Sequence, residues 1–337
     1  MPPTTASIHS PTPANLRRLA AALRRGELVA IPTETVYGLA ASALDARACR
    51  KIFRAKRRPA ADPLIVHVLD MVHAAPLAHL PPAAVQLAKK FWPGPLTLVV
   101  KKKSIVPAVV TAGRDSVALR SPAHPLTRRL LRLAGVPLAA PSANPFGYIS
   151  PTTAEHVRQS LGRRIRYILD GGPCRVGVES TILDLRDPAR PRILRPGAVS
   201  AAALSRVLGR KVAAGRVPRK ARTPRAGAIA PGLMKQHYSP RTPLKLAGDR
   251  IRMAAREIPA DAAMIFWRRP AGSFPRGRVY WLSARGSLPE AARNLYAVLR
   301  RADQGGHARL LVETMPGAAG GLAGAINDRL RRAAACI

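Results

Sequence analysis

The stretch LVAIPTETVYGLA, residues 28–40, constrains the fold of this chain more than any other segment. Its first four residues are apolar and end at Pro32, which has no N–H to donate to a sheet, so they predict a short buried strand. Thr33, Glu34 and Thr35 follow directly, and open α/β sheets bind their ligands beyond such strand ends. The alternative is a polar turn whose hydroxyls cap the next segment.

Apolar runs and helical repeats alternate along the chain, although irregularly and with prolines between them. This pattern predicts an α/β protein with a twisted mixed sheet and helices, rather than a regular doubly wound fold. In the N-terminal part we expect helices over 16–23, 45–55, 84–91, 125–134 and 152–161, and strands over 64–69, 96–100, 117–120, 136–140, 167–169 and 181–185.

Shifts in composition predict four segments. We expect a loose tail over residues 1–12, a first domain over 13–205, a basic linker over 206–243 and a smaller α/β domain over 244–337. The linker prediction rests on a run rich in Arg, Lys, Gly and Pro with few large apolar residues. In the second domain we expect helices over 249–257, 289–302 and 322–334, and strands over 263–267, 279–282 and 310–314.

The charge of the chain is strongly positive, with 56 Lys and Arg against 18 Asp and Glu and a formal net charge of +38. Such a field attracts polyanions, so nucleic acid or phosphorylated ligands are expected partners. Because the basic residues are scattered rather than gathered in one block, a general bias toward arginine on solvated faces is the alternative.

The cysteines and the N-terminus bear on the compartment. Cys49, Cys174 and Cys336 are far apart and odd in number, which is typical of reduced thiols rather than of a disulfide framework or a zinc site. No apolar run is long enough to span a bilayer, and the first residues do not have the pattern of a signal peptide. We therefore expect a cytoplasmic protein with no membrane partner.

The common nucleotide-binding and metal-binding motifs are missing. The sequence has no GxxxxGK[ST], and its Gly-rich GAAGGLAG lacks the GxGxxG spacing. It has no HExxH and no paired cysteines, so we expect no protein metal site. If the protein binds a nucleotide, another set of residues must hold it.

Lys56, Arg58 and Arg120 are the cations most suited to such a site. We expect the first two on an extended segment with both side chains on the same side, where they suit a triphosphate; surface charge is the alternative. Arg120 ends an apolar strand and needs an acidic partner or ligand, which a substrate carboxylate, Glu34 or Glu179 could supply.

Polar side chains near other strands complete the candidate set. His67 lies within the apolar run LIVHVL, either as a satisfied core residue or as a ligand. Ser142 and Asn144 follow an apolar strand in PSAN, and Ser150 precedes a helix, where its hydroxyl either caps the helix or holds phosphate. No Ser–His–Asp triad and no obvious general base are present, so positioning and electrostatics must carry the chemistry.

Taken together, these stretches resemble the Sua5/YrdC/YciO family. The order and spacing match over residues 14–205, and the C-terminal part resembles the longer Sua5-type members. The matching segments are IPTETVYGLA, KRRPAADPLIVHV, WPGPLTLVV, VALRSPAHP, PLAAPSANPFGYISPT, LDGGPCRVGVESTILDL, ILRPGAV, PGLMKQHYSP and GLAGAINDRLRRAA.

The resemblance implies an L-threonylcarbamoyladenylate synthase, a nucleotidyltransferase. Such enzymes convert L-threonine, bicarbonate and ATP into threonylcarbamoyl-AMP and pyrophosphate, and the product serves N6-threonylcarbamoyladenosine synthesis at position 37 of tRNA. The implied fold is a YrdC-like twisted mixed sheet with a concave basic face, followed by a Rossmann-like Sua5 domain. The implied partners are tRNA, by direct contact or through the proteins of the transferase complex.

The resemblance also implies roles for individual residues. Lys56 and Arg58 are the catalytic cations, with Mg²⁺ assisting attack on the α-phosphate, and Tyr238 of HYSP folds back over the nucleotide. Asp62 departs from the family, which often has Asn or His there. A carboxylate would repel phosphates unless Arg57 or Arg58 pairs with it, or unless it contacts ribose or metal. The threonine-binding positions are Thr35, His67, Arg120, Ala140 and Ser180, and the ATP-binding positions are Lys56, Arg58, Asp62, Ser116, Ser142, Asn144, Ser150, Arg195 and Tyr238.

Two rival functions belong to other classes. One is a YrdC-type RNA-binding protein without synthase activity, which the positive charge suits. The other is a carbamoyl-adenylate-forming module of hydrogenase maturation proteins, which carry acylphosphatase and Cys-rich zinc segments that this sequence lacks. The KxR, PSAN and HYSP segments favour the enzyme, because simple RNA binding does not require the linker motif.

Overall fold

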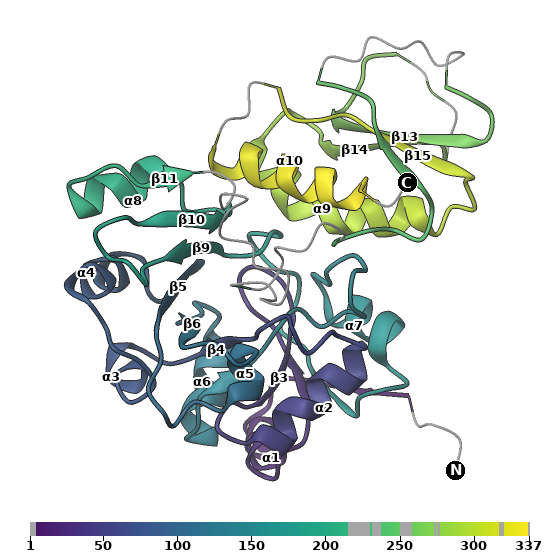
Figure 1. Cartoon of the computed structure of the whole chain (residues 1–337). Helices are drawn as coiled ribbons and strands as arrows, with labels where there is room; N and C mark the ends of the chain where they lie inside the picture. The colour runs from purple at the N-terminus through teal and green to yellow at the C-terminus, as the bar shows by residue number, and fades with distance from the viewer. Residues whose placement is uncertain are drawn as a thin grey trace.

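Two β-sheets with their helices make up the computed structural model of the chain (Figure 1). It describes residues 5–214, 230, 237–249, 258–272, 274, 277–316 and 320–335. The first sheet has eleven strands in the order β1-β8-β2-β3-β7-β4-β6-β5-β9-β10-β11. Its pairs are both parallel, as in β4 with β6, and antiparallel, as in β5 with β6, so the predicted mixed sheet is confirmed.

The strands of the first sheet are short. Their bounds are β1 (Ser7–His9), β2 (Val29–Ile31), β3 (Gly38–Ser42), β4 (Ile65–His67), β5 (Leu96–Lys101), β6 (Ser116–Arg120), β7 (Leu138–Ala139), β8 (Tyr167–Leu169), β9 (Thr181–Asp184), β10 (Arg192–Arg195) and β11 (Ala213–Ala214). The accompanying helices are α1 (Pro13–Arg24), α2 (Ala46–Lys56), α3 (Met71–Ala74), α4 (Pro82–Phe91), α5 (Ala108–Thr111), α6 (Pro125–Ala134), α7 (Ala154–Leu161) and α8 (Ala201–Leu208).

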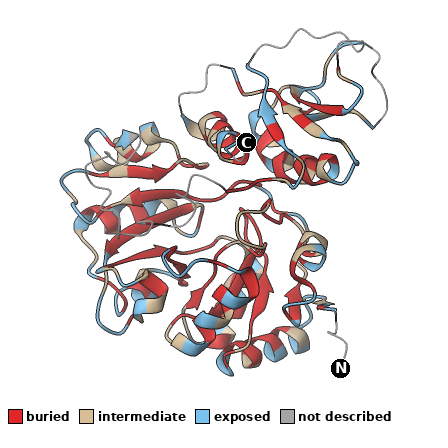
Figure 2. Cartoon of the chain, turned by 45° about the vertical axis from the view of Figure 1, so that its right-hand side comes forward, coloured by how far each residue is buried: buried red, intermediate tan, exposed pale blue. Residues whose placement is uncertain are grey.

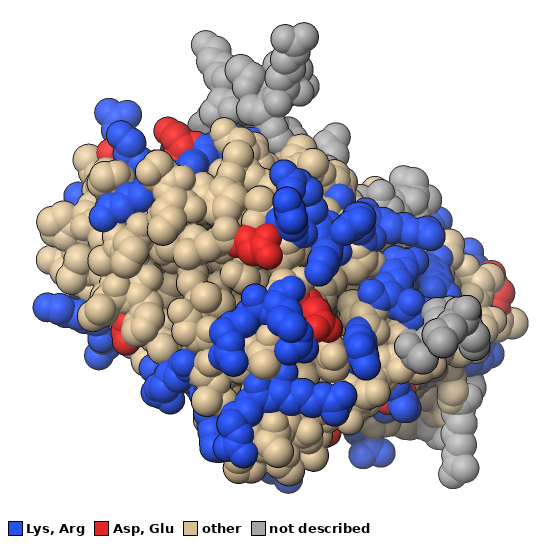
Figure 3. Space-filling view, turned by 90° about the horizontal axis from the view of Figure 1, so that it is seen from below, with Lys and Arg blue, Asp and Glu red and all other residues tan. Residues whose placement is uncertain are grey.

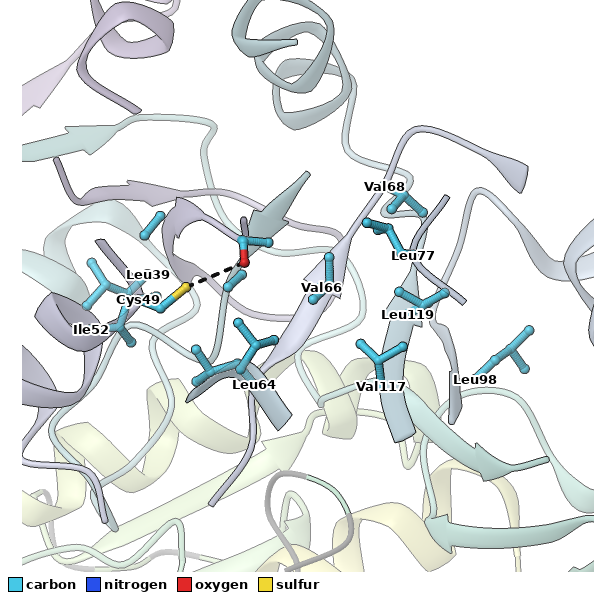
Figure 4. Close-up of a cluster of buried hydrophobic side chains, with 14 of the residues drawn as sticks. Leu39, Cys49, Ile52, Leu64, Val66, Val68, Leu77, Leu98, Val117 and Leu119 are labelled. Atoms are coloured by element: carbon cyan, nitrogen blue, oxygen red, sulfur yellow. Dashed lines mark hydrogen bonds between the residues drawn. The ribbon is translucent and has the colours of Figure 1, made fainter. Parts of the chain in front are cut away.

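Helices cover both faces of this sheet, and successive residues of each strand point toward opposite faces. In β2, Val29 and Ile31 join the core beneath α1 and α6, whereas Ala30 joins the core beneath α2 and α4. Figure 4 shows the latter core, in which the thiol of Cys49 donates to the carbonyl of Ser42 at 3.3 Å. In the first sheet most strand residues are buried, as are the helix residues that face them (Figure 2).

The face of the sheet that α1 and α6 cover extends past these helices to β4, β6 and β9. Ile65, Ala118 and Ile182 point to this side and form a separate small apolar cluster. Ala230, from the segment between the two domains, is buried in the same cluster. At Ala230, the connecting segment therefore lies against the same face of the sheet as α1 and α6.

Three expectations about the first domain need correction. The predicted tail is too long, since Ser7–His9 pairs in parallel with β8 as an edge strand. The strand β3 was not expected, although it pairs antiparallel with β2. The expected boundary at residue 205 falls inside α8, and β11 still pairs with β10. These strands depend on a neighbouring strand rather than on a long apolar pattern of their own.

The second sheet is wholly parallel, in the order β12-β15-β13-β14, as a Rossmann-like unit requires. Its elements are β12 (Leu244–Leu246), β13 (Ala262–Arg268), β14 (Val279–Ser283), α9 (Leu288–Asp303), β15 (Arg309–Val312) and α10 (Gly321–Ala333). Helices α9 and α10 lie on the side of this sheet that faces the first domain (Figure 1). The helix expected over 249–257 lies outside the described residues except for residue 249, as does Cys336.

Both domains share one apolar core. Val36, Ile149 and Val178 of the first domain pack with residues of α9 and α10. The loop at Gly177 approaches α9 so closely that a Cβ there would lie 2.3 Å from the Cα of Arg293. Within the described residues, no helix has both the length and the apolarity needed to cross a membrane.

Candidate active site

A buried cavity lies where the small cluster over β4 and β6 meets the connecting segment. His67 and Arg120 are the last residues of these parallel strands and stand opposite one another in the register. Carboxyl ends of parallel strands are the usual place for ligands in α/β proteins. The cavity is lined by Thr33, Thr35, Val36, Gly38, Arg58, Ile65, His67, Arg120, Ala140, Pro141, Ser142, Glu179, Ser180, Arg195, His237 and Tyr238.

The structure brings most of the predicted site residues together. Nine of them line the cavity: Thr35, Arg58, His67, Arg120, Ala140, Ser142, Ser180, Arg195 and Tyr238. Five others are not part of the lining: Lys56, Asp62, Ser116, Asn144 and Ser150. These five are buried, and their contacts are described below.

Arg120 forms an ion pair with Glu34. Of the two glutamates that the sequence left open as its acidic partner, the structure therefore selects Glu34 rather than Glu179. Its Nη2 donates to Glu34 Oε1 at 2.7 Å, Nη1 to Thr35 Oγ1 at 3.0 Å and Nε to the carbonyl of Gly94 at 3.2 Å. The second oxygen of Glu34 accepts from the backbone N–H of Ala123. Since a guanidinium has five N–H groups, two remain to hold a carboxylate in the cavity.

His67 is a neutral imidazole in this setting. Burial and the positive charge of Arg120 lower the pKa of His67 to about 3. Its Nδ1 has no hydrogen-bond partner within the described part of the chain. A neutral, unpaired ring nitrogen beside Arg120 can donate to or accept from a ligand, which favours the ligand role over that of a satisfied core residue.

Lys56 and Arg58 do not lie on the extended segment that was expected. Lys56 is the last residue of α2, and Arg57 then adopts a left-handed conformation with φ of 52°, which ends the helix. Lys56 Nζ donates to the carbonyls of Ser142 and Asn144. Burial and the nearby charge of Arg58 hold the pKa of Lys56 well below its usual value.

Asp62 is the partner of Arg58, so the expected repulsion of phosphates is offset. Its Oδ2 lies 2.9 Å from Arg58 Nη2, an ionic contact, although neither oxygen accepts a hydrogen bond of good geometry within the described residues. Arg58 also donates to the carbonyls of Asp62 and Pro63. Burial raises the pKa of Asp62, against the opposing effect of Arg58 and Lys56.

Ser180 and Arg195 form another part of the cavity wall. Arg195 donates to the carbonyl and the hydroxyl of Ser180 at 3.0 and 3.2 Å, and Ser180 Oγ lies 2.7 Å from Thr97 Oγ1. Ser116 stands on β6 on the same side as Arg120, four residues earlier. Its hydroxyl is buried and has no hydrogen-bond partner in the described ranges, so it is available to a ligand.

Asn144 and Ser150 make hydrogen bonds that the sequence did not predict. Asn144 Nδ2 donates to the carbonyls of Pro145 and Tyr148, which fixes the loop after PSAN. Ser150 neither caps a helix nor stands free, since its Oγ donates to Glu179 Oε1 at 2.6 Å. Burial raises the pKa of Glu179, but Arg329 and Arg195 outweigh this and lower it overall.

The connecting segment closes the cavity with His237 and Tyr238. Tyr238 has a φ of 67°, unusual for a residue with a side chain, and its ring stacks on that of Tyr296 with centroids 5.8 Å apart. Burial and Arg58 hold the pKa of His237 well below its usual value, so its ring is neutral. The sequence analysis did not assign a role to His237; its place next to Tyr238 in HYSP was the available signal.

The arrangement is suited to an anionic ligand with a carboxylate at one end. Lys56, Arg58 and Arg195 lie at one side, and Arg120 with its two remaining N–H groups lies at the other. No group of three or more His, Cys, Asp or Glu in the described part of the chain could hold a metal ion. Fold and site together define a twisted mixed sheet that carries a cavity lined by cationic side chains, with His237 and Tyr238 of the connecting segment in its wall.

Comparison with known proteins identifies the family. The Sua5/YciO/YrdC family model, described as telomere recombination, matches residues 21–197. The model described as threonylcarbamoyl-AMP synthase, C-terminal domain, matches residues 199–335. The chain belongs to the Sua5/YciO/YrdC family, with the additional C-terminal domain of the Sua5 type.

Relatives of full length support the same assignment. The threonylcarbamoyl-AMP synthase of Pyrococcus abyssi is 40% identical over 326 residues, covering 94% of this chain and 93% of the relative. That of Bacillus subtilis is 39% identical over 327 residues, covering 95% and 92%. A crystal structure of P. abyssi Sua5 complexed with L-threonine superposes with a TM-score of 0.87 at 38% identity, covering 98% of each chain.

Proposed function

We propose that this protein is a threonylcarbamoyl-AMP synthase, which uses L-threonine, bicarbonate and ATP as substrates. The observation that carries the proposal is the junction, in one cavity, of a carboxylate site at Arg120 with a cluster of buried cations. The names of the full-length relatives and the threonine complex of the P. abyssi protein support it.

In this proposal, the two ends of the cavity bind different substrates. Arg120 binds the threonine carboxylate, while Thr35, His67 and Ser180 surround the rest of the amino acid, with Ala140 in the wall. The triphosphate lies toward the other cations, and Tyr238 covers it. The ATP-binding residues are Lys56, Arg58, Asp62, Ser116, Ser142, Asn144, Ser150, Arg195 and Tyr238, with Asp62 and Asn144 acting through Arg58 and the loop after PSAN.

The chemistry needs positioning more than acid–base catalysis. The neutral threonine amine attacks bicarbonate with loss of water, or CO₂ with loss of a proton to solvent, and forms a carbamate. A carbamate oxygen then attacks the α-phosphate in line as pyrophosphate leaves. Lys56 and Arg58 stabilise the charge that develops on the phosphoryl oxygens and the leaving group. With a pKa of about 3, His67 is too weak a base to deprotonate the amine and serves to orient threonine.

Mg²⁺ enters this proposal as part of the substrate. A metal site built from side chains is not found among the described residues. Mg²⁺ commonly binds through phosphate oxygens and water with few protein ligands, so MgATP needs no such site. We infer that the cation arrives on the triphosphate.

We further propose that tRNA contacts the protein directly, through arginines of α2, before transfer by partner proteins. Arg47, Arg50, Arg54 and Arg57 follow a helical spacing and are all exposed. Lys and Arg gather on the underside of the first domain, away from the second domain (Figure 3). The phosphate backbone of RNA is the polyanion that such a surface attracts.

Replacing Arg47, Arg50 and Arg54 by Gln tests the tRNA proposal. We expect the slope of log affinity against log salt to fall by about 3, one for each phosphate that is no longer neutralised. A control that removes three exposed charges elsewhere, at Arg206, Arg210 and Lys211, should leave the slope nearly unchanged. Equal slopes for both variants would indicate attraction by net charge alone.

The compartment and the extent of the domains complete the proposal. We place the reaction in the cytoplasm, and buried free thiols at Cys49 and Cys174 agree with a reducing compartment. We assign residues 5–214 to the YrdC-like domain, because β1 and β11 belong to its sheet, and 244–335 to the Sua5 domain, with the linker between them.

Pyrophosphate release separates the synthase from an RNA-binding protein without activity. We expect release that requires L-threonine and bicarbonate, with much less from L-serine, which lacks the threonine methyl group. Folded protein that releases no pyrophosphate would exclude the synthase and favour the RNA-binding function. Release that is independent of bicarbonate would indicate a different adenylate-forming reaction.

A further inference from the structure

Glu179 is the point at which the second domain meets the candidate nucleotide site. It lines the cavity and is almost fully buried. One carboxylate oxygen, Oε1, accepts from Ser150 Oγ at 2.6 Å. The other, Oε2, accepts from Tyr296 Oη at 2.8 Å and from Arg329 Nε at 2.9 Å. Thus one oxygen is bound to the first domain and the other to α9 and α10.

Arg329 of α10 makes this contact from a buried position in the domain interface. Its side chain is fully buried, and it donates to the carbonyls of Pro196 and Glu179 as well as to Asp328. A buried guanidinium is stabilised by ionised partners, and Glu179 is the partner that the first domain supplies, beside Asp328 of α10 itself. Ionised Glu179 therefore stabilises the docked position of α10. Tyr296 keeps its proton, because burial and Glu179 raise its pKa well above the usual value.

The other oxygen of Glu179 fixes the direction of the Ser150 hydroxyl. Because the hydroxyl proton is donated to Glu179, Ser150 Oγ presents only lone pairs to a ligand. A carboxylate nearby also disfavours a bare phosphate oxygen. Ser150 is therefore suited to accept a hydrogen bond, such as one from a ribose hydroxyl of the nucleotide.

We propose that Glu179 is a positioning residue, and that Tyr296 and Arg329 of the second domain act through it to orient Ser150 for the nucleotide. The second domain is thereby part of the nucleotide site without touching the reacting atoms. This inference rests on the proposed function, since it takes Ser150 as an ATP ligand.

Tyr296→Phe is the mildest change that breaks this connection. Phenylalanine keeps the ring that stacks on Tyr238 and removes only the hydroxyl that donates to Glu179. The chain offers a matched control, because Tyr148 Oη also donates to a carboxylate across the domain interface, Asp303 Oδ2, at the same 2.8 Å. Tyr148→Phe therefore removes an equivalent interdomain hydrogen bond away from Glu179.

The test measures KM for ATP and for threonine in full-length wild type, both single variants, Ser150→Ala and the Ser150→Ala/Tyr296→Phe double variant. We expect Tyr296→Phe to raise KM for ATP about fivefold, the effect of one net hydrogen bond, with KM for threonine nearly unchanged. Tyr148→Phe should leave both constants unchanged. In the Ser150→Ala background, Tyr296→Phe should have almost no further effect, since the group through which it acts is gone.

Other outcomes would overturn the proposal. Equal effects of Tyr296→Phe and Tyr148→Phe would mean that Tyr296 only joins the domains. An effect of Tyr296→Phe that persists in the Ser150→Ala background would show that Ser150 does not mediate it. Absence of threonine-dependent turnover in the wild type would instead refute the proposed function, and equilibrium binding of ATP to the same variants would then decide the connection by itself.

Discussion

Arg120→Lys probes the threonine site with the least damage to the fold. Alanine at this position would leave the buried carboxylate of Glu34 without its cation, which typically costs about 3–5 kcal/mol of stability. Lysine keeps a positive charge opposite Glu34 but cannot reproduce the fork of a guanidinium. The substitution therefore separates charge compensation within the protein from recognition of the substrate.

The size of the effect follows from the donors of Arg120. Three of its N–H groups are used by Glu34, Thr35 and Gly94, and two remain for a threonine carboxylate. Lysine can restore at most one of those two bonds. A charge-assisted hydrogen bond contributes about 1.5–3 kcal/mol, so KM for threonine should rise about 10- to 150-fold.

Initial rates of pyrophosphate release measure this prediction. Threonine is varied at saturating ATP and bicarbonate, and ATP is then varied at saturating threonine. We expect KM for ATP to change less than about twofold, because the proposed function places the triphosphate toward the other cations. Arg128→Lys is the control, since Arg128 donates to Leu69 and Ser121 and does not line the cavity. An unchanged KM for threonine would show that Arg120 serves only as the partner of Glu34.

Three further predictions concern the other buried ionisable groups. Lys56→Met should raise the Kd for ATP about tenfold or more in isothermal titration, with little effect on the Kd for threonine, because it removes a buried cation of the proposed phosphate site. An unchanged Kd for ATP would refute a phosphate role for Lys56. Asp62→Asn should strengthen ATP binding, because it removes a negative charge beside the proposed phosphate site, and should lower the melting temperature, because it removes the ionic partner of Arg58. Weaker ATP binding would mean that Asp62 chiefly orients Arg58. His67 has a folded pKa of about 3 against 6.5 unfolded, so the unfolded state binds more protons and stability falls as pH drops from 6.5 toward 3. In urea unfolding, His67→Asn should reduce the loss of stability between pH 7 and 4.5 by about 2.5 kcal/mol. An unchanged loss would contradict a buried neutral imidazole.

Long apolar runs made much of the fold predictable. The strands β4, β5 and β6 and the helices α1, α6 and α9 fall where the patterns indicate them. The strands β1 and β3 could not be found in this way, because they are short and are stabilised by pairing with β8 and β2. The expected extended segment at Lys56 was wrong because α2 continues to Lys56 and ends through a left-handed Arg57.

The candidate site was predictable where polar residues interrupt or end apolar strands. His67 and Arg120 stand out in this way, and the structure places them side by side. Tyr296 and Arg329 could not be found, since each belongs to an amphipathic helix and reaches Glu179 across 117 and 150 residues of sequence. Only the packing of the second domain on the first brings these groups together.

Incorporation of ¹³C-bicarbonate tests the central claim most directly. The protein is incubated with ATP, Mg²⁺, L-threonine and labelled bicarbonate, and the nucleotide products are analysed by mass spectrometry. The proposed function predicts an adduct of AMP, threonine and one carbonate carbon that is heavier by one mass unit with the label and absent without threonine. An adduct of AMP and threonine without the labelled carbon, or no adduct from folded protein, would contradict it.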